Sequence, residues 1–427
     1  MFSSLRVRNY RLFTVGQVVS NTGTWMQRIA QDWLVLRLTG SSAAVGVTVA
    51  LQFLPALLLG LYGGVLADRW PGRRTLLVTQ SAAGLTSLSL AVLTLSGQVE
   101  LWHVYVTAFL LGVIGVVDKP ARRAFVPELV GPADLHNAIA LHCANSESAR
   151  LAGPAVAGVL ITSLGSGAAF LLNGLSYLAP IVGLLMMRTS ELHRPSERRP
   201  RGRGELREGL RCVARRPELL WPVVLGGFLG TFAYNFPVWI TAFVTDVFHA
   251  GPGTYGLLNT LMAGGSLLGA LFTARCGCPR RRVLVGAALL FGLAEAVAAL
   301  APAFWVFAVL LVPVGALGLV SSTTANCSVQ LAADPALRGR VVSVFTTVFM
   351  GGTPLGAALT GWITETYGAR AGFLSGGLVS ATAAVAVGCV LSRSAGVRLS
   401  VDPRRGRRCV TLVPRGRAPA AAEARAG

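Results

Sequence analysis

The sequence predicts an all-α integral membrane protein with twelve transmembrane helices in two six-helix halves. Three observations lead to this prediction. Charged residues make up 13% and hydrophobic residues 53% of the 427-residue chain, whereas roughly a quarter of the residues of a soluble domain are charged. Apolar stretches of about 20 residues, the length that spans a bilayer, recur along the chain. Short hydrophilic connections separate these stretches.

The candidate spans are the apolar stretches themselves, of which the first and the fifth are the least apolar. They cover residues 12–36, 43–66, 75–96, 101–118, 138–162, 167–188, 219–246, 254–274, 283–300, 303–325, 340–363 and 369–391. The longest connection lies near the middle and divides the chain into two halves. We therefore expect an N-terminal half at 1–189, a cytoplasmic central loop with a short amphipathic helix at 190–217, a C-terminal half at 218–392 and a disordered basic cytoplasmic tail at 393–427.

The net charge of +20 comes almost entirely from arginine. These arginines lie in alternate connections and in both terminal segments, and do not form a stripe on a soluble fold, which argues against nucleic-acid binding. Positive charge accumulates on the cytoplasmic side of membrane proteins. The pattern therefore predicts a multi-pass membrane protein with both termini in the cytoplasm, whose arginines lie near anionic lipid. The excess of arginine over lysine is typical of a GC-rich bacterial genome, so we expect the bacterial plasma membrane.

Several chemistries have no sequence motif here. The cysteines and histidines do not occur in pairs at zinc-ligand spacing, and the chain has no phosphate-binding loop and no hydrolase motif. We expect no enzyme activity, no metal and no cofactor.

The two halves show a weak internal repeat. Gly131-Pro-Ala-Asp before the fifth span corresponds to Asp334-Pro-Ala before the eleventh, and Gly153-Pro154 inside the fifth corresponds to Gly352-Thr-Pro354 inside the eleventh. Repeated halves with a substrate site between them near the bilayer midplane are a transporter arrangement.

Ionisable residues inside spans are costly in a membrane and are functional candidates. Arg28 and Asp32 in the first span are four residues apart, and Glu147 and Arg150 in the fifth are three apart, so each pair shares one helical face. Either pair could bind protons and substrate, with Asp32 preferred over Glu147. The alternative for both is a static ion pair that holds two helices together.

Other polar residues in the spans are weaker candidates. Asn235 lies at a break with aromatic neighbours in the seventh span, where it either lines a cavity or takes part in packing. Glu295 in the ninth span lacks a basic neighbour, and Asp118 with Arg122 at the end of the fourth forms either a gate or an anchor.

The connection between the second and third spans reads Gly64-Val-Leu-Ala-Asp68-Arg69-Trp-Pro-Gly72-Arg73-Arg74. It resembles the signature loop of the major facilitator superfamily, with one extra residue, Pro71. The resemblance implies a cytoplasmic gate, in which Asp68 contacts a helix N-terminus or an arginine of the other half. The alternative is that the arginines only anchor the topology.

Further stretches resemble one bacterial branch of this superfamily, which includes enterobactin exporters and macrolide-efflux-like proteins. They are Asn9-Tyr-Arg-Leu-Phe, Trp33-Leu-Val-Leu-Arg-Leu-Thr-Gly-Ser and Pro120-Ala-Arg-Arg-Ala-Phe-Val-Pro-Glu-Leu-Val. Gly153, Pro154 and Gly158 partly match the superfamily's antiporter motif. The match implies a helix bend that closes the cavity against leak, although a generic packed kink is an equal alternative.

The resemblance implies a secondary transporter with a small-molecule substrate and, as expected for many members, protons as the coupling ion. We expect the protein to be monomeric. The leading hypothesis is proton-coupled export of a small amphiphilic molecule, such as a drug, a secondary metabolite or a siderophore. The alternatives are a facilitator-type importer or uniporter on the same fold, and a membrane sensor or scaffold that transports nothing.

Overall fold

The computed structural model describes residues 3–131, 134–193, 205–276, 281–334, 337–394, 397–401 and 410–414. Within these ranges, the side chains of 61–69, 205–207, 276, 281, 393–394 and both terminal strands are outside the description.

Both halves of the molecule are built of helices. The N-terminal half contains η1 (Ser3–Arg6), α1 (Arg8–Thr39), α2 (Ser42–Arg69), α3 (Gly72–Leu95), α4 (Leu101–Leu129), α5 (Leu135–Leu164), α6 (Ser166–Ser176) and α7 (Leu178–Leu185). The C-terminal half contains α9 (Pro217–Phe228), η3 (Leu229–Ala233), α10 (Phe236–Ala242), η4 (Phe243–Val247), α11 (Pro252–Cys276), α12 (Arg281–Ala299), α13 (Phe304–Ala332), α14 (Arg338–Gly351), α15 (Thr353–Tyr367) and α16 (Ala369–Ser394). Between the halves lie η2 (Thr189–Glu191) and α8 (Glu205–Arg215).

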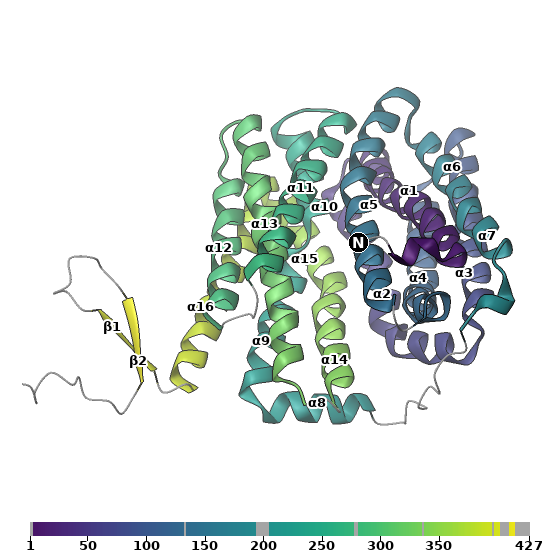
Figure 1. The fold of residues 1–427 in the computed structure, drawn as a ribbon. Helices are drawn as coiled ribbons and strands as arrows, with labels where there is room; N and C mark the ends of the chain where they lie inside the picture. The colour runs from purple at the N-terminus through teal and green to yellow at the C-terminus, as the bar shows by residue number, and fades with distance from the viewer. Residues whose placement is uncertain are drawn as a thin grey trace, which may run out of the picture.

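The two halves lie side by side, the N-terminal half in purple to blue and the C-terminal half in teal to yellow-green (Figure 1). Each of the twelve predicted spans coincides with helical structure. Among the described residues, ten stretches are long and apolar enough to cross a membrane. The other two predicted spans are α1 and α5, so length and composition alone do not establish a count of twelve.

Both α1 and α5 carry polar side chains that are buried against other helices. In α1 these include Gln17, Gln27, Gln31 and Asp32, each at most 3% exposed. Polar groups are tolerated in the interior of a bundle, where they contact neighbouring helices and not lipid. The low hydropathy of α1 therefore reflects its interior position.

Three spans are interrupted by residues that break regular helix. In the seventh, two π-helical segments, η3 and η4, flank α10, and Asn235 and Pro237 lie at the start of α10. In the sixth, Tyr177 separates α6 from α7, and in the eleventh Gly352 separates α14 from α15. Proline removes a backbone donor, so the helix is interrupted where it occurs.

The outer surface of the bundle is apolar. Leu85, Val159, Val309 and Leu355 lie on four different helices and are 67–70% exposed. A soluble protein rarely exposes so much apolar surface, whereas hydrocarbon lipid accommodates it. This surface is that of a membrane protein.

The two halves differ in how their interiors are filled. Polar side chains lie between α1, α3 and α6, where Asn173 Nδ2 donates to Gln27 Oε1 at 2.5 Å and to Ser87 Oγ at 3.3 Å. The C-terminal interior is aromatic, with Phe243 stacked on Phe307 at 4.3 Å between ring centroids and Trp239 against Phe373 at 4.9 Å. A polar network between helices thus marks the N-terminal interior, and a cluster of aromatic rings marks the C-terminal interior.

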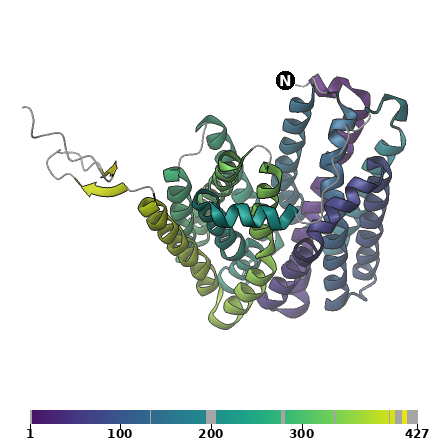
Figure 2. The ribbon, with the colours of Figure 1, turned by 90° about the horizontal axis from the view of Figure 1, so that it is seen from below.

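The central connection contains α8, which lies across one end of the C-terminal half (Figure 2). Glu208 of α8 forms an ion pair with Arg340 of α14. Beside it, Arg216 Nη2 lies 2.8 Å from Asp334 Oδ2, and the hydrogen bond with this carboxylate raises the pKa of Arg216. These contacts hold α8 against α14, and the start of α9 against the connection that follows α13.

The tail beyond α16 contains two short strands, β1 (Val397–Val401) and β2 (Val410–Pro414), paired antiparallel. These ten residues are the only part of the tail beyond α16 that the structure describes, so the disorder expected of the tail stays a prediction. Apolar and polar residues alternate in β1, and β-branched residues recur in β2, a pattern that favours strands. The other residues after Ser394 are outside the described ranges.

Candidate functional site

Asp32 lies at the boundary between the halves. It is 3% exposed, and Tyr255 of α11 donates a hydrogen bond from its hydroxyl to Asp32 Oδ2 at 3.2 Å. The ring of Tyr255 also stacks on Trp33 at 6.2 Å. Asp32 Oδ1 has no hydrogen-bond partner among the described residues. One carboxylate oxygen thus binds the opposite half and the other is available.

Arg28 does not form the ion pair with Asp32 that their spacing allows, as far as the described side chains show. Its guanidinium instead lies over the ring of Trp25, with Cζ 4.8 Å from the ring centroid. Arg150 of α5 approaches the same ring at 5.8 Å. The two arginines named from the sequence therefore meet at one tryptophan.

Glu147 and Arg150 form the pair that their spacing predicts, but loosely. The distance from Arg150 Nη1 to Glu147 Oε2 is 3.9 Å, and the side chains are 26% and 40% exposed for Arg150 and Glu147. Arg150 also lines a small pocket with Tyr234, Met262, Ser266 and Ser322 of the C-terminal half. It therefore reaches the space between the halves.

Asn235 is fully buried, and its Nδ2 donates to the carbonyl oxygen of Thr231 at 2.7 Å in the same span. Its neighbours Tyr234 and Phe236 line the pocket instead. The break at Asn235 thus positions two aromatic side chains, one on each side of it.

The halves meet closely at one end of the molecule. A Cβ added to Gly256 of α11 would lie 2.7 Å from Cα of Gly158 and 2.7 Å from the carbonyl oxygen of Pro154, both in α5. Only glycine permits backbones to approach so closely. Two of the three residues of the predicted helix-bend motif are therefore in contact with the other half, whereas Gly153 packs on α1, with Met26 N 3.1 Å from an added Cβ.

A second contact closes the same end. Glu365 Oε2 of α15 accepts hydrogen bonds from Ser41 Oγ at 3.0 Å and from the backbone N–H of Ala43 at 3.2 Å. Ser41 and Ala43 lie at the N-terminus of α2, where the helix dipole favours a negative charge. We name the contacts at Gly158–Gly256, Asp32–Tyr255 and Ser41–Glu365 the closed end.

The predicted gate motif is described only in part. The side chains of Gly64, Asp68 and Arg69 are outside the described residues, so the contact expected of Asp68 stays a prediction. Arg73 Nε donates to the carbonyl oxygen of Leu184 at 2.7 Å, at the C-terminal end of α7. An added Cβ on Gly72 would lie 2.9 Å from Phe125 Cδ2 of α4. Both residues thus hold the start of α3 within the N-terminal half.

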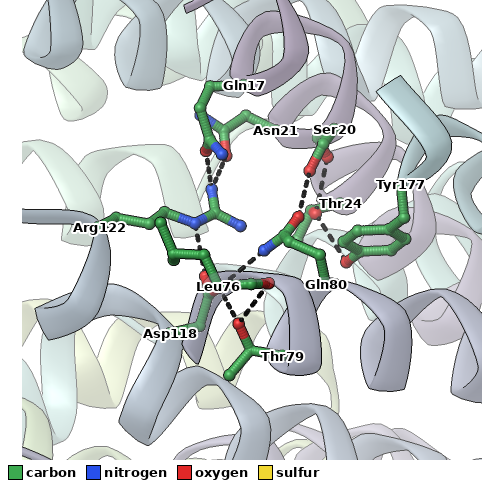
Figure 3. Close-up of polar contacts among 10 residues, drawn as sticks. All are labelled: Gln17, Ser20, Asn21, Thr24, Leu76, Thr79, Gln80, Asp118, Arg122 and Tyr177. Carbon is green, nitrogen blue, oxygen red and sulfur yellow. Dashed lines mark hydrogen bonds and ion pairs between the residues drawn. The ribbon is translucent and has the colours of Figure 1, made fainter. Parts of the chain in front are cut away.

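Asp118 and Arg122 of α4 are the centre of a polar network (Figure 3). Arg122 Nε lies 2.5 Å from Asp118 Oδ2, and the guanidinium also donates to Gln17 and to Asn21 of α1. Asp118 Oδ1 accepts from Thr79 Oγ1 at 2.8 Å and from Gln80 Nε2 at 2.7 Å. Because all partners lie in one half, the pair joins α1, α3 and α4.

Glu295 of α12 is fully buried, and neither carboxylate oxygen has a hydrogen-bond partner in the described part of the chain. It faces α16, where an added Cβ on Gly377 would lie 3.1 Å from its Cβ. Within the same described ranges, no group of three or more His, Cys, Asp or Glu side chains could hold a metal ion.

Sequence patterns alone did not single out Trp25, Tyr255 or Glu365. Their importance depends on contacts with distant residues, such as the 223-residue separation of Asp32 and Tyr255. Tyr255 could have been suspected from the sequence, because it lies within an apolar span and a buried hydroxyl usually requires a hydrogen-bond partner.

Comparison with known proteins agrees with this architecture. The multidrug efflux pump Tap of Mycobacterium tuberculosis (strain ATCC 25618 / H37Rv) is 29% identical over 381 residues, covering 85% of this chain and 89% of Tap. Macrolide efflux protein A of Streptococcus pyogenes is 23% identical over 386 residues, covering 88% and 94%. The crystal structure of a bacterial homologue of the human lysosomal transporter Spinster, in an inward-facing and occupied conformation, superposes with a TM-score of 0.70 at 14% identity, covering 90% of this chain and 96% of that one.

A family model described as transmembrane secretion effector matches residues 1–401. The predicted resemblance to the efflux branch of the major facilitator superfamily is therefore confirmed. The chain is a multi-pass membrane protein, and its family and fold are those of transporters. It belongs to the transmembrane secretion effector family of major facilitator transporters.

Proposed function

We propose that the protein exports a small amphiphilic molecule across the bacterial plasma membrane in exchange for protons. The observation that carries the proposal is the position of Asp32. This carboxylate is buried, and one of its oxygens accepts a hydrogen bond from Tyr255 of the opposite half. Such a group senses whether the halves are together or apart. The efflux relatives support export over uptake.

The arginine pattern supplies an orientation. The connections at the closed end are nearly free of positive charge, and residues 39–42 and 163–166 contain no arginine or lysine. The connection that contains α8 is rich in arginine, and positive connections face the cytoplasm. The closed end is therefore assigned to the outer side, with both termini and the central loop in the cytoplasm.

Alternating access follows from this arrangement. Opening the outer end separates Tyr255 from Asp32 and gives the carboxylate access to protons from outside. Closing that end re-forms the bond and returns Asp32 to the side facing the cytoplasm, where the proton leaves and substrate enters. A transporter needs two such states with contacts that differ between them. Glu147, partly exposed on α5, is the second candidate for proton binding.

Partners follow from the same geometry. The cavity residues come from the two halves of a single chain, so we infer that the monomer is the transporting unit. The small molecule and the proton are its ligands, and its arginine-rich face lies against anionic lipid.

The test uses proteoliposomes with an imposed pH gradient, in which proton release is followed as lipophilic drugs, macrolides and siderophores are added. Asp32→Asn is compared with the wild type. Asp246→Asn, at an exposed acid near the same end, is the matched control. We expect substrate-dependent proton flux in the wild type and in the control, and none in Asp32→Asn.

Substrate movement without proton flux would identify a facilitator and overturn the antiport mechanism. Proton flux that persists in Asp32→Asn would move the coupling group elsewhere. No response to any compound, with the protein folded, would favour the sensor or scaffold alternative.

A further inference from the structure

Two cationic side chains of the N-terminal half approach one aromatic ring, and one of them, Arg150, also lines the pocket between the halves. The guanidinium groups of Arg28 and Arg150 come from α1 and α5, and both approach Trp25, at 4.8 and 5.8 Å from its centroid. An arginine stacked on an aromatic ring uses the face of its guanidinium. The N–H groups at its edge stay available as donors, and arginine has five of them.

The two acids beside this pair, Asp32 and Glu147, do not form close ion pairs with it. Glu147 is 3.9 Å from Arg150 and partly exposed, so the contact is long and solvated. Asp32 interacts electrostatically with Arg28 but accepts its hydrogen bond from Tyr255, so its carboxylate does not form a close ion pair with Arg28. Positive charge inside a membrane-spanning bundle is costly without a counter-charge. An anion that enters the cavity would relieve this cost.

The side chains that face Arg150 from the C-terminal half offer both polar and apolar groups. Tyr234, Ser266 and Ser322 supply hydroxyl groups, whereas Met262 and Phe236 supply apolar surface, and all five line the same pocket as Arg150. Pockets of this composition bind ligands with an apolar body and a few polar groups.

We propose that Arg28 and Arg150 bind an anionic group, a carboxylate or sulfonate, of an aromatic or apolar substrate that packs beside Trp25. The proposal names the substrate class of the exporter proposed above and rests on that function. Guanidinium groups recognise such anions through paired, charge-assisted hydrogen bonds.

The test compares two probes with the same aromatic scaffold. Anilinonaphthalene sulfonate carries an anionic group, and N-phenylnaphthylamine is its neutral counterpart. Binding of each is measured by fluorescence with the full-length protein in phosphatidylcholine nanodiscs, after subtraction of empty nanodiscs. The variants are Arg28→Gln, Arg150→Gln and Arg150→Lys. Arg37→Gln, at an exposed arginine on the same helix as Arg28, is the control.

We expect the wild type and Arg37→Gln to bind the sulfonate at least about tenfold more tightly than the neutral probe. Arg28→Gln and Arg150→Gln should each weaken sulfonate binding by about tenfold while neutral-probe binding stays constant, which also shows that the cavity is folded. Arg150→Lys keeps the charge without the paired donors and should give an intermediate affinity.

Equal affinity of the wild type for both probes would overturn the proposal, and so would a parallel loss of both probes in an arginine variant. The proposed transport function is scored separately, by proton release in proteoliposomes. If only the neutral probe causes proton release, the proposed export function stands and the proposed preference for anions is wrong. If sulfonate binding depends on the arginines but causes no proton release, the proposed anion site stands and the proposed coupling of export to protons is wrong.

Discussion

The Tyr255 hydroxyl donates a hydrogen bond to Asp32 Oδ2 at 3.2 Å, across the boundary between the two halves. The bond exists only while the halves are together at this end. It links the position of the C-terminal half directly to the environment of a buried acid, and so it is the first contact to alter.

Tyr255→Phe should weaken the closed end. The phenylalanine ring retains the stacking on Trp33 but leaves both oxygens of Asp32 without a partner, which costs about 1–3 kcal/mol. We expect a larger population in which the outer end is open.

Spin labels at Arg37 and Tyr367, both exposed near that end, would report this by pulsed distance measurement in a cysteine-free background. Asp32→Asn keeps an acceptor and should change the distances less. Identical distances in wild type and Tyr255→Phe would show that the bond does not contribute to closure.

Gly256→Ala should prevent the outer end from closing. The added Cβ would meet backbone atoms of Gly158 and Pro154 at 2.7 Å, and a backbone cannot rotate out of the way as a side chain can. Gly264→Ala is the matched control on the same helix, because the nearest atom, Leu151 Cδ1, would be 3.9 Å away. Both changes raise helix propensity by about 1 kcal/mol, so stability does not separate them. We expect transport to be lost only in Gly256→Ala, and equal transport in both variants would refute the close packing.

The sequence was sufficient to locate the helices, because apolar length and the connections between spans are local properties. It was less reliable for α1, whose buried face carries Gln27, Gln31 and Asp32 and lowers its hydropathy. The spacing of Glu147 and Arg150 also predicted their contact correctly, since three residues bring side chains together on any helix.

The spacing of Arg28 and Asp32 allows an ion pair, but in the structure each side chain has another partner. Asp32 binds Tyr255 and Arg28 stacks on Trp25. Helical periodicity predicts which residues share a face, but it does not predict which side chains of another helix contact that face. For the same reason, the contact of Glu365 with Ser41 could not be predicted, since 324 residues separate them.

Removing either partner of the Asp118–Arg122 pair should destabilise the N-terminal half. Breaking a buried pair leaves one uncompensated charge, at a cost of about 3–5 kcal/mol. Asp118→Asn and Arg122→Gln should each lower the apparent melting temperature, and the double variant should recover part of the loss because no charge then remains alone. Arg123→Gln, at the exposed neighbouring arginine, is the control and should change little. A double variant whose loss equals the sum of the single losses would indicate that the two charges do not interact.

Glu295→Met should raise the thermal stability of the protein. The side chain is fully buried, and both carboxylate oxygens lack a partner in the described part of the chain. The packed helix α13 contains no charged residue, and the charges of α16, Arg370 and Arg393, lie at its ends. Methionine fills a similar volume without buried polar atoms, so we expect a gain of about 1–3 kcal/mol, read as a higher apparent melting temperature. Leu293→Met, at an exposed position of the same helix, controls for the new residue type.

Because Asp32 carries the proton in the proposed mechanism, proton-coupled transport should persist in Glu295→Met. If coupling is lost instead while the protein remains folded, the buried acid of α12 has a part in proton binding and the mechanism requires a second site in the C-terminal half.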